Sequence, residues 1–514
     1  MSSSFEEAKY YFGLGLILFE QGDYIGAEGK FVKALLRSPE RLSILINLSA
    51  TLIQLEKWIE CEVICQKILT IEPTNYDALL NLGVCLAHNN NEAIALEYLD
   101  QAIEINSKSD LAWTNKGNIF QELNNLSAAS QCFDTALSIN PTSQEALIGR
   151  GNLRNELKDY QLALEDFDHV LRLNPSNANA SWNKALSLLR LGNFKEGWAL
   201  YESRWQISGM REHAKKLEVP LWLGKDSLNK KSILIHAEQG YGDTIQFSRY
   251  LPALESLGAR VWLQTPKVLI SLLQTLSPTI KIIESDKIPN ERIDFHCPIM
   301  SLALAFGTTL ETIPSQMPYL FADKYKRQIW RHKLESRSKE ERQSQKPFRI
   351  GLTWVGSGHY AGKKSVKRDI PANEVKKLID AFPSISIEFH SLQVERDVNK
   401  YLHQLTNGRL FLHDQSLSDF SDTAALISEL DLIISIDTAT AHLAGALNIP
   451  LIQILPDPPN FMSLLVVDKS PWYPSALLLR QTHPGDWSAP IMTASHKISK
   501  RLGLAVPQSL QPNA

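Results

Sequence analysis

Apolar positions in the first 205 residues repeat with a period of 34. Within each period they follow the i, i+4, i+7 spacing of one helix face. These positions are Ala27, Phe31, Ala34; Cys61, Cys65, Ile68; Ala95, Leu99, Ala102; Ala129, Phe133, Ala136; and Ala163, Phe167, Val170. A proline follows the helical run at Pro39, Pro73, Pro141 and Pro175, and Ser107 takes the vacant place. A fixed period of this length predicts stacked helical repeats in an all-α solenoid.

A small residue stands 24 positions before each of these grid points, where the two helices of a repeat must approach closely. These residues are Gly15, Ser49, Gly83, Gly117 and Gly151, and Ala185 starts an imperfect sixth copy. The pattern resembles the tetratricopeptide repeat. The resemblance implies a solenoid over 5–205, with five full repeats and a partial sixth, whose concave face binds a peptide or partner protein.

After Trp205 the period stops, and the polar stretch 206–230 is typical of a linker. Short β-rich runs then alternate with helical stretches, which predicts parallel sheets covered by helices. The predicted strands are 232–236, 260–264, 280–283 and 293–296, then 349–354, 386–391, 431–436, 451–455 and 477–479. We therefore expect two doubly wound, Rossmann-like α/β halves, 231–323 and 348–504, joined by a charged helix at 324–347 and followed by a flexible tail, 505–514.

Composition narrows the classes of partner and compartment. With 53 basic and 56 acidic residues, the net charge of −3 provides no overall field for nucleic acid. Five cysteines are too few and odd in number for a disulfide framework, which favours a reducing compartment. The N-terminus lacks signal-peptide features, and Asp437, His442 and Pro450 interrupt the most apolar stretch, so we expect no integral membrane segment. We expect a cytoplasmic protein; peripheral association with the inner face of a membrane stays open.

Two patterns in the repeats invite a metal-site interpretation. Cys61 and Cys65 have CxxxC spacing, but both lie at core positions of a repeat helix, which favours packing over metal binding. Asp166 and Asp168 form a DxD pair around Phe167, and we expect both to face solvent. We therefore predict no metal site.

Two segments of the α/β region carry candidate chemistry. The first runs from Gly240 to Thr244, where Gly240 and Gly242 allow a ligand close to the backbone and Asp243 lies at a predicted helix start. A purely structural N-cap role for Asp243 is an open alternative. In the second segment, 433–447, a buried strand ends at Asp437 and a helix follows.

The start of that second helix could hold a diphosphate, because its first amides are free and its positive end favours anions. Thr438 and Thr440 could assist. His442 lies on the same turn, and packing within the helix is its ordinary alternative.

Seven blocks in order resemble glycosyltransferase family 9, the relatives of lipopolysaccharide heptosyltransferases, over about 231–487. They are HAEQGYGDTIQFSRYLP, HCPIMSLALAFGTTLETIP, GLTWVGS, RDIP, HSLQ, SDTAALISELDLIISIDTATAHLAGAL and SPWYP. The resemblance implies a two-domain GT-B fold and inverting, metal-independent transfer from a nucleotide-diphospho-sugar, which is a co-substrate, so that no cofactor is required.

The resemblance also implies residue roles. Asp243 matches the family's proposed general base, which takes a proton from the acceptor hydroxyl. The implied donor-binding residues are Gly240, Gly242, Thr244, Arg368, Asp437, Thr438, Ala439 and His442. A solvated surface position is the alternative for Arg368.

The chain also departs from the family pattern. Relatives commonly carry a tryptophan- and arginine-rich segment before SPWYP, whereas this chain has no arginine in 460–469. The loop 356–367 is basic, with Lys363, Lys364 and Lys367, and either closes over phosphates or is simply solvated. Two functions are therefore open: a glycosyltransferase acting on a glycan or protein hydroxyl, or a non-catalytic repeat scaffold with a degenerate transferase-like domain.

Overall fold

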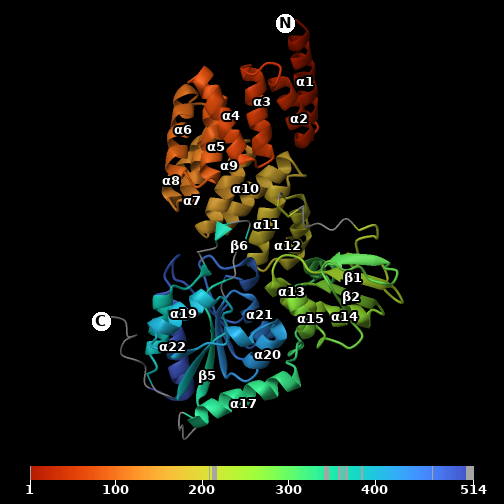
Figure 1. Cartoon of the computed structure of the whole chain (residues 1–514), viewed down its shortest axis with the longest axis vertical. Helices are drawn as coiled ribbons and strands as arrows, with labels where there is room; N and C mark the ends of the chain where they lie inside the picture. The colour runs from red at the N-terminus through yellow and green to blue at the C-terminus, as the bar shows by residue number, and fades with distance from the viewer. Residues whose placement is uncertain are drawn as a thin grey trace. The chain divides into compact units, whose positions relative to one another are not determined.

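The computed structural model describes residues 2–207, 209–210, 217–340, 346–356, 359–360, 363–364, 368–383, 386–465 and 467–504. The predicted tail 505–514, most of the basic loop including Lys367, and residues 341–345 of the predicted connecting helix lie outside these ranges. The chain divides into two compact units, Met1–Asn183 and Lys184–Ala514 (Figure 1).

The first unit is built of helices that pack in consecutive pairs. They are α1 (Ser2–Glu20), α2 (Tyr24–Leu35), α3 (Leu42–Gln54), α4 (Trp58–Ile71), α5 (Tyr76–His88), α6 (Glu92–Ile105), α7 (Asp110–Glu122), α8 (Leu126–Ile139), α9 (Gln144–Glu156) and α10 (Tyr160–Leu173), and α11 (Ala178–Arg190) follows. The predicted apolar stripes are fully buried throughout. A Cβ added at Gly15 would lie 2.5 Å from the Phe31 ring, and one at Gly151 would lie 2.5 Å from the Phe167 ring. The small residues therefore sit where paired helices touch, as the repeat pattern predicts.

The prediction that Asp166 faces solvent is wrong. Its side chain is buried, and its carboxylate pairs with Arg150 Nη2 at 2.8 Å and Arg154 Nη1 at 2.6 Å. Two arginines from the neighbouring helix α9 thus compensate the burial of one carboxylate, which the local sequence of α10 does not indicate. Asp168 is half-buried.

The cysteines of the repeats are core residues. Cys61 and Cys65 are both fully buried, with their sulfur atoms 3.8 Å apart. Within the described ranges, no group of three or more potential ligands could hold a metal ion.

Residues 184–205, which the repeat pattern assigns to the solenoid, belong to the second compact unit, together with Gln206 of the predicted linker. They include α12 (Phe194–Tyr201) and the 3-10 turn η1 (Glu202–Gln206). Trp198 and Tyr201 of α12 are almost fully buried there, and the Trp198 ring meets the Phe247 ring edge to face at 5.7 Å.

The first α/β half contains a four-stranded parallel sheet of order β3-β2-β1-β4. Its strands are β1 (Ser232–His236), β2 (Arg260–Thr265), β3 (Lys281–Glu284) and β4 (Phe295–Pro298), and its helices and turns are α13 (Tyr241–Phe247), η3 (Ser248–Tyr250), α14 (Leu251–Ser256), α15 (Lys267–Leu273), η4 (Ile299–Ser301) and α16 (Leu302–Ala305). Strand β1 is buried at every position, as expected of a central parallel strand.

The second half contains a six-stranded parallel sheet of order β12-β11-β10-β5-β8-β9. Its strands are β5 (Phe348–Thr353), β8 (Ile387–Ser391), β9 (Leu410–Phe411), β10 (Leu432–Ile436), β11 (Leu451–Leu455) and β12 (Ala476–Arg480); a separate hairpin pairs β6 (His359–Tyr360) with β7 (Lys363–Lys364). The nine predicted strands are present, whereas β9 and the hairpin are too short to show a pattern in the sequence.

Helices cover both faces of this larger sheet. Figure 1 shows α19 and α22 on one side of β5, and α20 and α21 on the other. The helices and turns are α17 (Lys324–Glu340), which precedes this half, then α18 (Ala372–Asp380), α19 (Arg396–Leu405), η6 (Asp414–Ser416), α20 (Phe420–Ile427), α21 (Ala439–Ala446), η7 (Phe461–Ser463) and α22 (Ser488–Leu502). The second unit is therefore an α/β structure with two parallel sheets.

Candidate functional site

The candidate site forms where one strand-to-helix turn from each half meets the other. In the first half the turn joins β1 to α13, and in the second it joins β10 to α21. Helices α13 and α21 pack against each other. Because both strands are parallel strands of their sheets, both turns lie at carboxyl ends, where open α/β sheets bind ligands.

Gly242 is the point of closest approach between the two turns. A Cβ added there would lie 2.7 Å from Cδ2 of His442 and 3.5 Å from the Cα of Ala439. The space that a side chain would need is thus filled by the His442 ring. The missing side chain of Gly242 therefore lets the two halves pack together at this turn.

Asp243 is the third residue of α13, and the N-cap is Gly240. Its Oδ2 accepts a hydrogen bond from the Gly240 backbone N–H at 3.0 Å. Burial raises the pKa of the Asp243 carboxyl to about 7; the Gly240 bond opposes this shift, and the carboxylates of Asp437 and Glu238 add to it. A carboxyl group that titrates near neutrality can accept and release a proton under ordinary conditions.

The neighbouring predicted residues differ in exposure. Gly240 is exposed, whereas Thr244 is almost fully buried, with its hydroxyl 3.4 Å from the Gly240 carbonyl oxygen. Thr244 therefore points its hydroxyl into its own helix.

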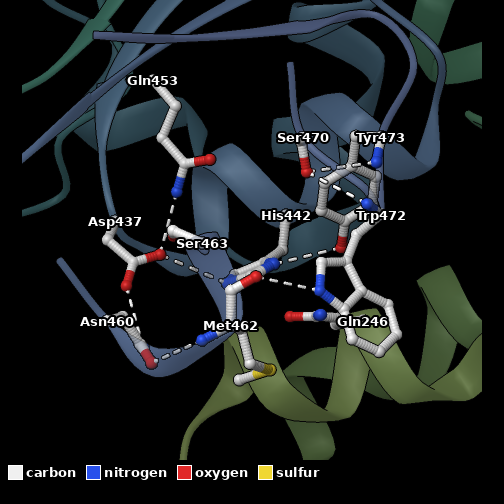
Figure 2. Close-up of a pocket in the computed structure, with 10 residues that line it drawn as sticks. All are labelled: Gln246, Asp437, His442, Gln453, Asn460, Met462, Ser463, Ser470, Trp472 and Tyr473. Atoms are coloured by element: carbon white, nitrogen blue, oxygen red, sulfur yellow. Dashed lines mark hydrogen bonds and ion pairs between the residues drawn. The ribbon is translucent and has the colours of Figure 1, made fainter. Parts of the chain in front are cut away.

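Asp437 is held by two side-chain amides, as Figure 2 shows. Gln453 Nε2 donates to Oδ1 at 2.9 Å, and Asn460 Nδ2 donates to Oδ2 at 3.0 Å. Both carboxylate oxygens therefore have a donor, which fixes the orientation of the group.

His442 lies between Asp437 and Tyr473. Its Nε2 is 3.6 Å from Asp437 Oδ1, and its Nδ1 is 3.0 Å from the Tyr473 hydroxyl (Figure 2). Burial lowers the pKa of His442, Asp437 opposes that shift, and Arg249 adds to it. These surroundings favour the neutral form of the imidazole.

Thr438 is the N-cap of α21, but its side chain does not cap the helix. Its hydroxyl lies 3.0 Å from the Ser435 hydroxyl instead. The first amides of α21, beginning at Ala439, receive no side-chain cap from the part of the chain that the structure describes. A helix start of this kind favours an anion.

A small cavity lies beside these groups. Its volume is about 10 Å³, which holds roughly one water molecule. The lining residues are Gln246, Asp437, His442, Gln453, Asn460, Met462, Ser463, Ser470, Trp472 and Tyr473. Asn460, Met462 and Ser463, within the segment that departs from the family pattern, thus form part of its wall.

Three of the polar residues at this cavity were missed by motif reasoning: Gln453, Asn460 and Tyr473. The sequence does point to Gln453, because it is a polar residue inside the otherwise apolar strand β11. Tyr473 lies within the SPWYP block, whereas nothing in the sequence around Asn460 indicates a bond to Asp437.

Arg368 does not line this cavity. Its guanidinium lies against Gly356, where an added Cβ would be 2.6 Å from Nη2. Its Nε is buried and has no hydrogen-bond partner among the described residues. Arg368 is therefore packed on its own loop.

Comparison with known proteins identifies the repeats. Tetratricopeptide repeat family models match residues 64–97, 111–143 and 156–205. The chain is 25% identical over 326 residues to Protein FlbA of Caulobacter vibrioides, in a match that covers 59% of this chain and 52% of FlbA. The chain therefore spans about half the length of this curated relative.

Two solved structures are similar to part of the chain. TTC0263, a thermophilic TPR protein of Thermus thermophilus, is 19% identical, with 35% of this chain and 99% of that chain covered and a TM-score of 0.33. Pseudomonas aeruginosa pilF is 18% identical, with 41% of this chain and 95% of that chain covered and a TM-score of 0.32.

The described helices include none long and apolar enough to cross a membrane.

Proposed function

We propose that the α/β region is a glycosyltransferase of the GT-B type, related to glycosyltransferase family 9. It moves a sugar from a nucleotide-diphospho-sugar to a hydroxyl of a glycan or protein, by one inverting displacement without a metal. The observation that carries the proposal is the meeting of two turns at Gly242, which brings Asp243 of one half beside Asp437 and His442 of the other.

Asp243 has the properties of a general base in this reaction. Its pKa of about 7 leaves an ionised fraction at neutral pH, together with a useful affinity for the proton of an attacking hydroxyl. Bases of this type are most effective when their pKa lies near the working pH.

The start of α21 supplies the donor side of the proposal. Its uncapped amides and positive end suit a diphosphate, and neutral His442 can donate or accept one hydrogen bond. Asp437 is held by amides, so we assign it an orienting role toward His442 and not a proton transfer.

A nucleotide-diphospho-sugar cannot occupy a cavity of about 10 Å³, so the donor needs a larger opening. In the proposal, residues 460–463 move away from Asp437 when the donor binds. The bond from Asn460 to Asp437 is the contact that this movement breaks.

The tetratricopeptide repeats support a role in protein interaction. We propose that they recruit the acceptor or a partner that carries it.

A second candidate function is a non-catalytic scaffold, in which the repeats bind a partner and the α/β region has lost turnover. The observation that favours it is the small size of the cavity, beside which Asn460 already donates a hydrogen bond to one oxygen of Asp437. The absence of arginine from 460–469 points the same way.

Donor binding separates the two functions. The full chain is heated with ADP-, UDP-, GDP- and CDP-sugars, and a ligand at about 100 times its Kd adds roughly 2.7 kcal/mol to the native state. We expect one nucleotide to stabilise the wild type and Asp243→Asn equally, and His442→Ala less. No stabilisation by any donor in a folded sample, with and without candidate acceptors, would favour the scaffold.

A further inference from the structure

Helix α12 and the turn η1 contact both sides of the candidate site. Tyr201, which is fully buried, accepts a hydrogen bond from Gln239 Nε2 at 2.9 Å. Gln239 belongs to the turn that carries Asp243. On the other side, the Tyr201 ring lies 5.6 Å from the ring of Phe461, which neighbours Asn460.

Arg204 of η1 fixes the same turn one residue earlier. Its guanidinium is fully buried and binds Glu238 with two hydrogen bonds, of 2.9 Å from Nε and 3.0 Å from Nη2. It also donates to Glu202 at 2.6 Å and to the Ser301 hydroxyl at 2.7 Å. A paired guanidinium and carboxylate of this geometry allow little movement of either group.

The turn is thus tied down at three consecutive residues. Arg204 holds Glu238, Tyr201 holds Gln239, and Asp243 itself holds the Gly240 N–H. Gln239 has a positive φ of 56°, a conformation that non-glycine residues adopt at a cost and that surrounding contacts must maintain.

The segment across the site is anchored to the same helix. Trp198 meets the Phe461 ring edge to face at 6.4 Å, and Phe194 stacks on Trp472 at 5.9 Å. Trp472 in turn donates from Nε1 to the Met462 carbonyl oxygen at 3.0 Å.

We propose that α12 and η1 form a positioning element of the candidate site, in which Tyr201 and Arg204 hold the turn that carries Asp243 at a fixed place in the first half. The inference rests on the proposed function of that site. It assigns to the sixth repeat, whose family model extends to residue 205, a task inside the α/β unit in addition to the repeat packing.

Tyr201→Phe tests the assignment with little disturbance, because the ring and its contact with Phe461 stay while the hydroxyl is lost. Tyr250→Phe is the matched control. Tyr250 is equally buried in the same unit, and its hydroxyl bonds Thr308 at 2.8 Å, away from both turns. Both variants lose one buried, hydrogen-bonded hydroxyl, so we expect similar decreases in the melting temperature.

The readout is the titration of Asp243, which requires neither donor nor turnover. Full-length protein labelled with ¹³C at the aspartate carboxyls is titrated by NMR, and Asp243→Asn identifies the resonance. Among the described residues, the charged and titratable groups around Asp243 include Glu238 on its own turn, Tyr201 of α12, and Asp437 and His442 across the site. We expect Tyr201→Phe to move the midpoint by about half a pH unit or more and Tyr250→Phe to leave it in place.

An unchanged Asp243 midpoint in Tyr201→Phe, with a stability loss equal to that of Tyr250→Phe, would overturn the proposal and leave Tyr201 a packing residue. Arg204→Lys keeps the charge and loses the paired bond, and should shift the midpoint further if it folds. Stabilisation by the donor panel tests the proposed function, whereas the Asp243 midpoint tests the positioning role, and neither result depends on the other. A shifted midpoint without donor binding would indicate a scaffold with a positioned turn; donor binding with an unchanged midpoint would indicate an enzyme in which Tyr201 does not position the turn.

Discussion

The two turns of the candidate site have the same architecture and opposite chemistry. Each follows a buried parallel strand, begins a helix and carries an aspartate. Asp243 is bonded to a backbone N–H of its own turn, and its pKa is raised to about 7. Asp437 accepts from two side-chain amides that come from elsewhere in the second half. Topology thus places the two carboxylates, and their surroundings differ: burial raises the pKa of Asp243, whereas two side-chain amides fix the orientation of Asp437.

The largest expected effect is the loss of sugar transfer when Asp243 is replaced. Asp243→Asn keeps the size of the side chain and removes the base, so transfer should fall roughly 10²–10⁴-fold with donor binding unchanged. Initial rates and donor titrations measure this once a donor is known.

Asp422→Asn is its matched control, because Asp422 is also the third residue of its helix and also accepts from the N-cap N–H. Burial alone would raise the pKa of Asp422, but hydrogen bonds from Lys326 and Ser418 hold this pKa below its ordinary value. Equal loss of transfer in both variants would refute the base assignment.

The contact between the turns is tested by Gly242→Ala. The new methyl group would meet the His442 ring at 2.7 Å, so we expect a loss of about 1–3 kcal/mol in the free energy of unfolding. Gly29→Ala in α2 is the control, because nothing lies within 4 Å of its added Cβ, and it should be neutral or slightly stabilising. Urea denaturation of both variants measures the difference; equal stabilities would mean that the two turns separate freely.

The amide bonds to Asp437 are tested by Asn460→Ala. Removing one donor from a half-buried carboxylate should cost about 1 kcal/mol of stability. Under the proposed function the same change also weakens closure, so donor affinity should rise while stability falls. A calorimetric titration with the donor measures affinity, and a fall in both quantities would contradict a closing role for Asn460.

Asp243→Asn and Asp422→Asn should also differ in the way that stability depends on pH. The native pKa of Asp243, about 7, lies above its ordinary value of 3.8, so the native state keeps this proton where the unfolded state has lost it. This group's contribution to stability therefore falls as the pH rises from about 4 to 7. Asp243→Asn should thus gain stability relative to the wild type over that interval, as measured by thermal unfolding at several pH values.

The Asp422→Asn variant should behave in the opposite way. The lowered native pKa of Asp422 gives a stabilisation that is present above the unfolded value of 3.8 and lost below it. The loss of stability of Asp422→Asn relative to the wild type should therefore be constant above about pH 5. A constant difference for Asp243→Asn as well would indicate that the Asp243 pKa is not raised.

Periodicity and motif spacing predicted the parts of this molecule that depend on local pattern. The 34-residue grid predicted the repeat helices and their buried stripes, and apolar runs predicted strands such as β1 and β10. What the sequence did not indicate depends on contacts between distant residues. Asp166 is buried because Arg150 and Arg154 pair with it, and Asp437 is fixed because Asn460, 23 positions later, reaches it.

The candidate site was predicted in the same uneven way. Asp243, Asp437 and His442 were found from their motifs and are brought close together, as the contact between Gly242 and His442 shows. Arg368 was also suggested by its motif, but it packs on Gly356. The contacts that Tyr201 and Arg204 make with the Asp243 turn had no signal, because the sequence places both residues in a repeat.

The small cavity beside Asp437 has a consequence for rates. Under the proposed function, a donor reaches His442 and the start of α21 only when residues 460–463 are displaced and the bond from Asn460 to Asp437 is broken, so that a fraction of the molecules is ready to bind at any moment. The apparent affinity is reduced by that fraction. In rapid-mixing experiments, the observed association rate should therefore level off with rising ligand concentration, at a plateau equal to the rate of opening.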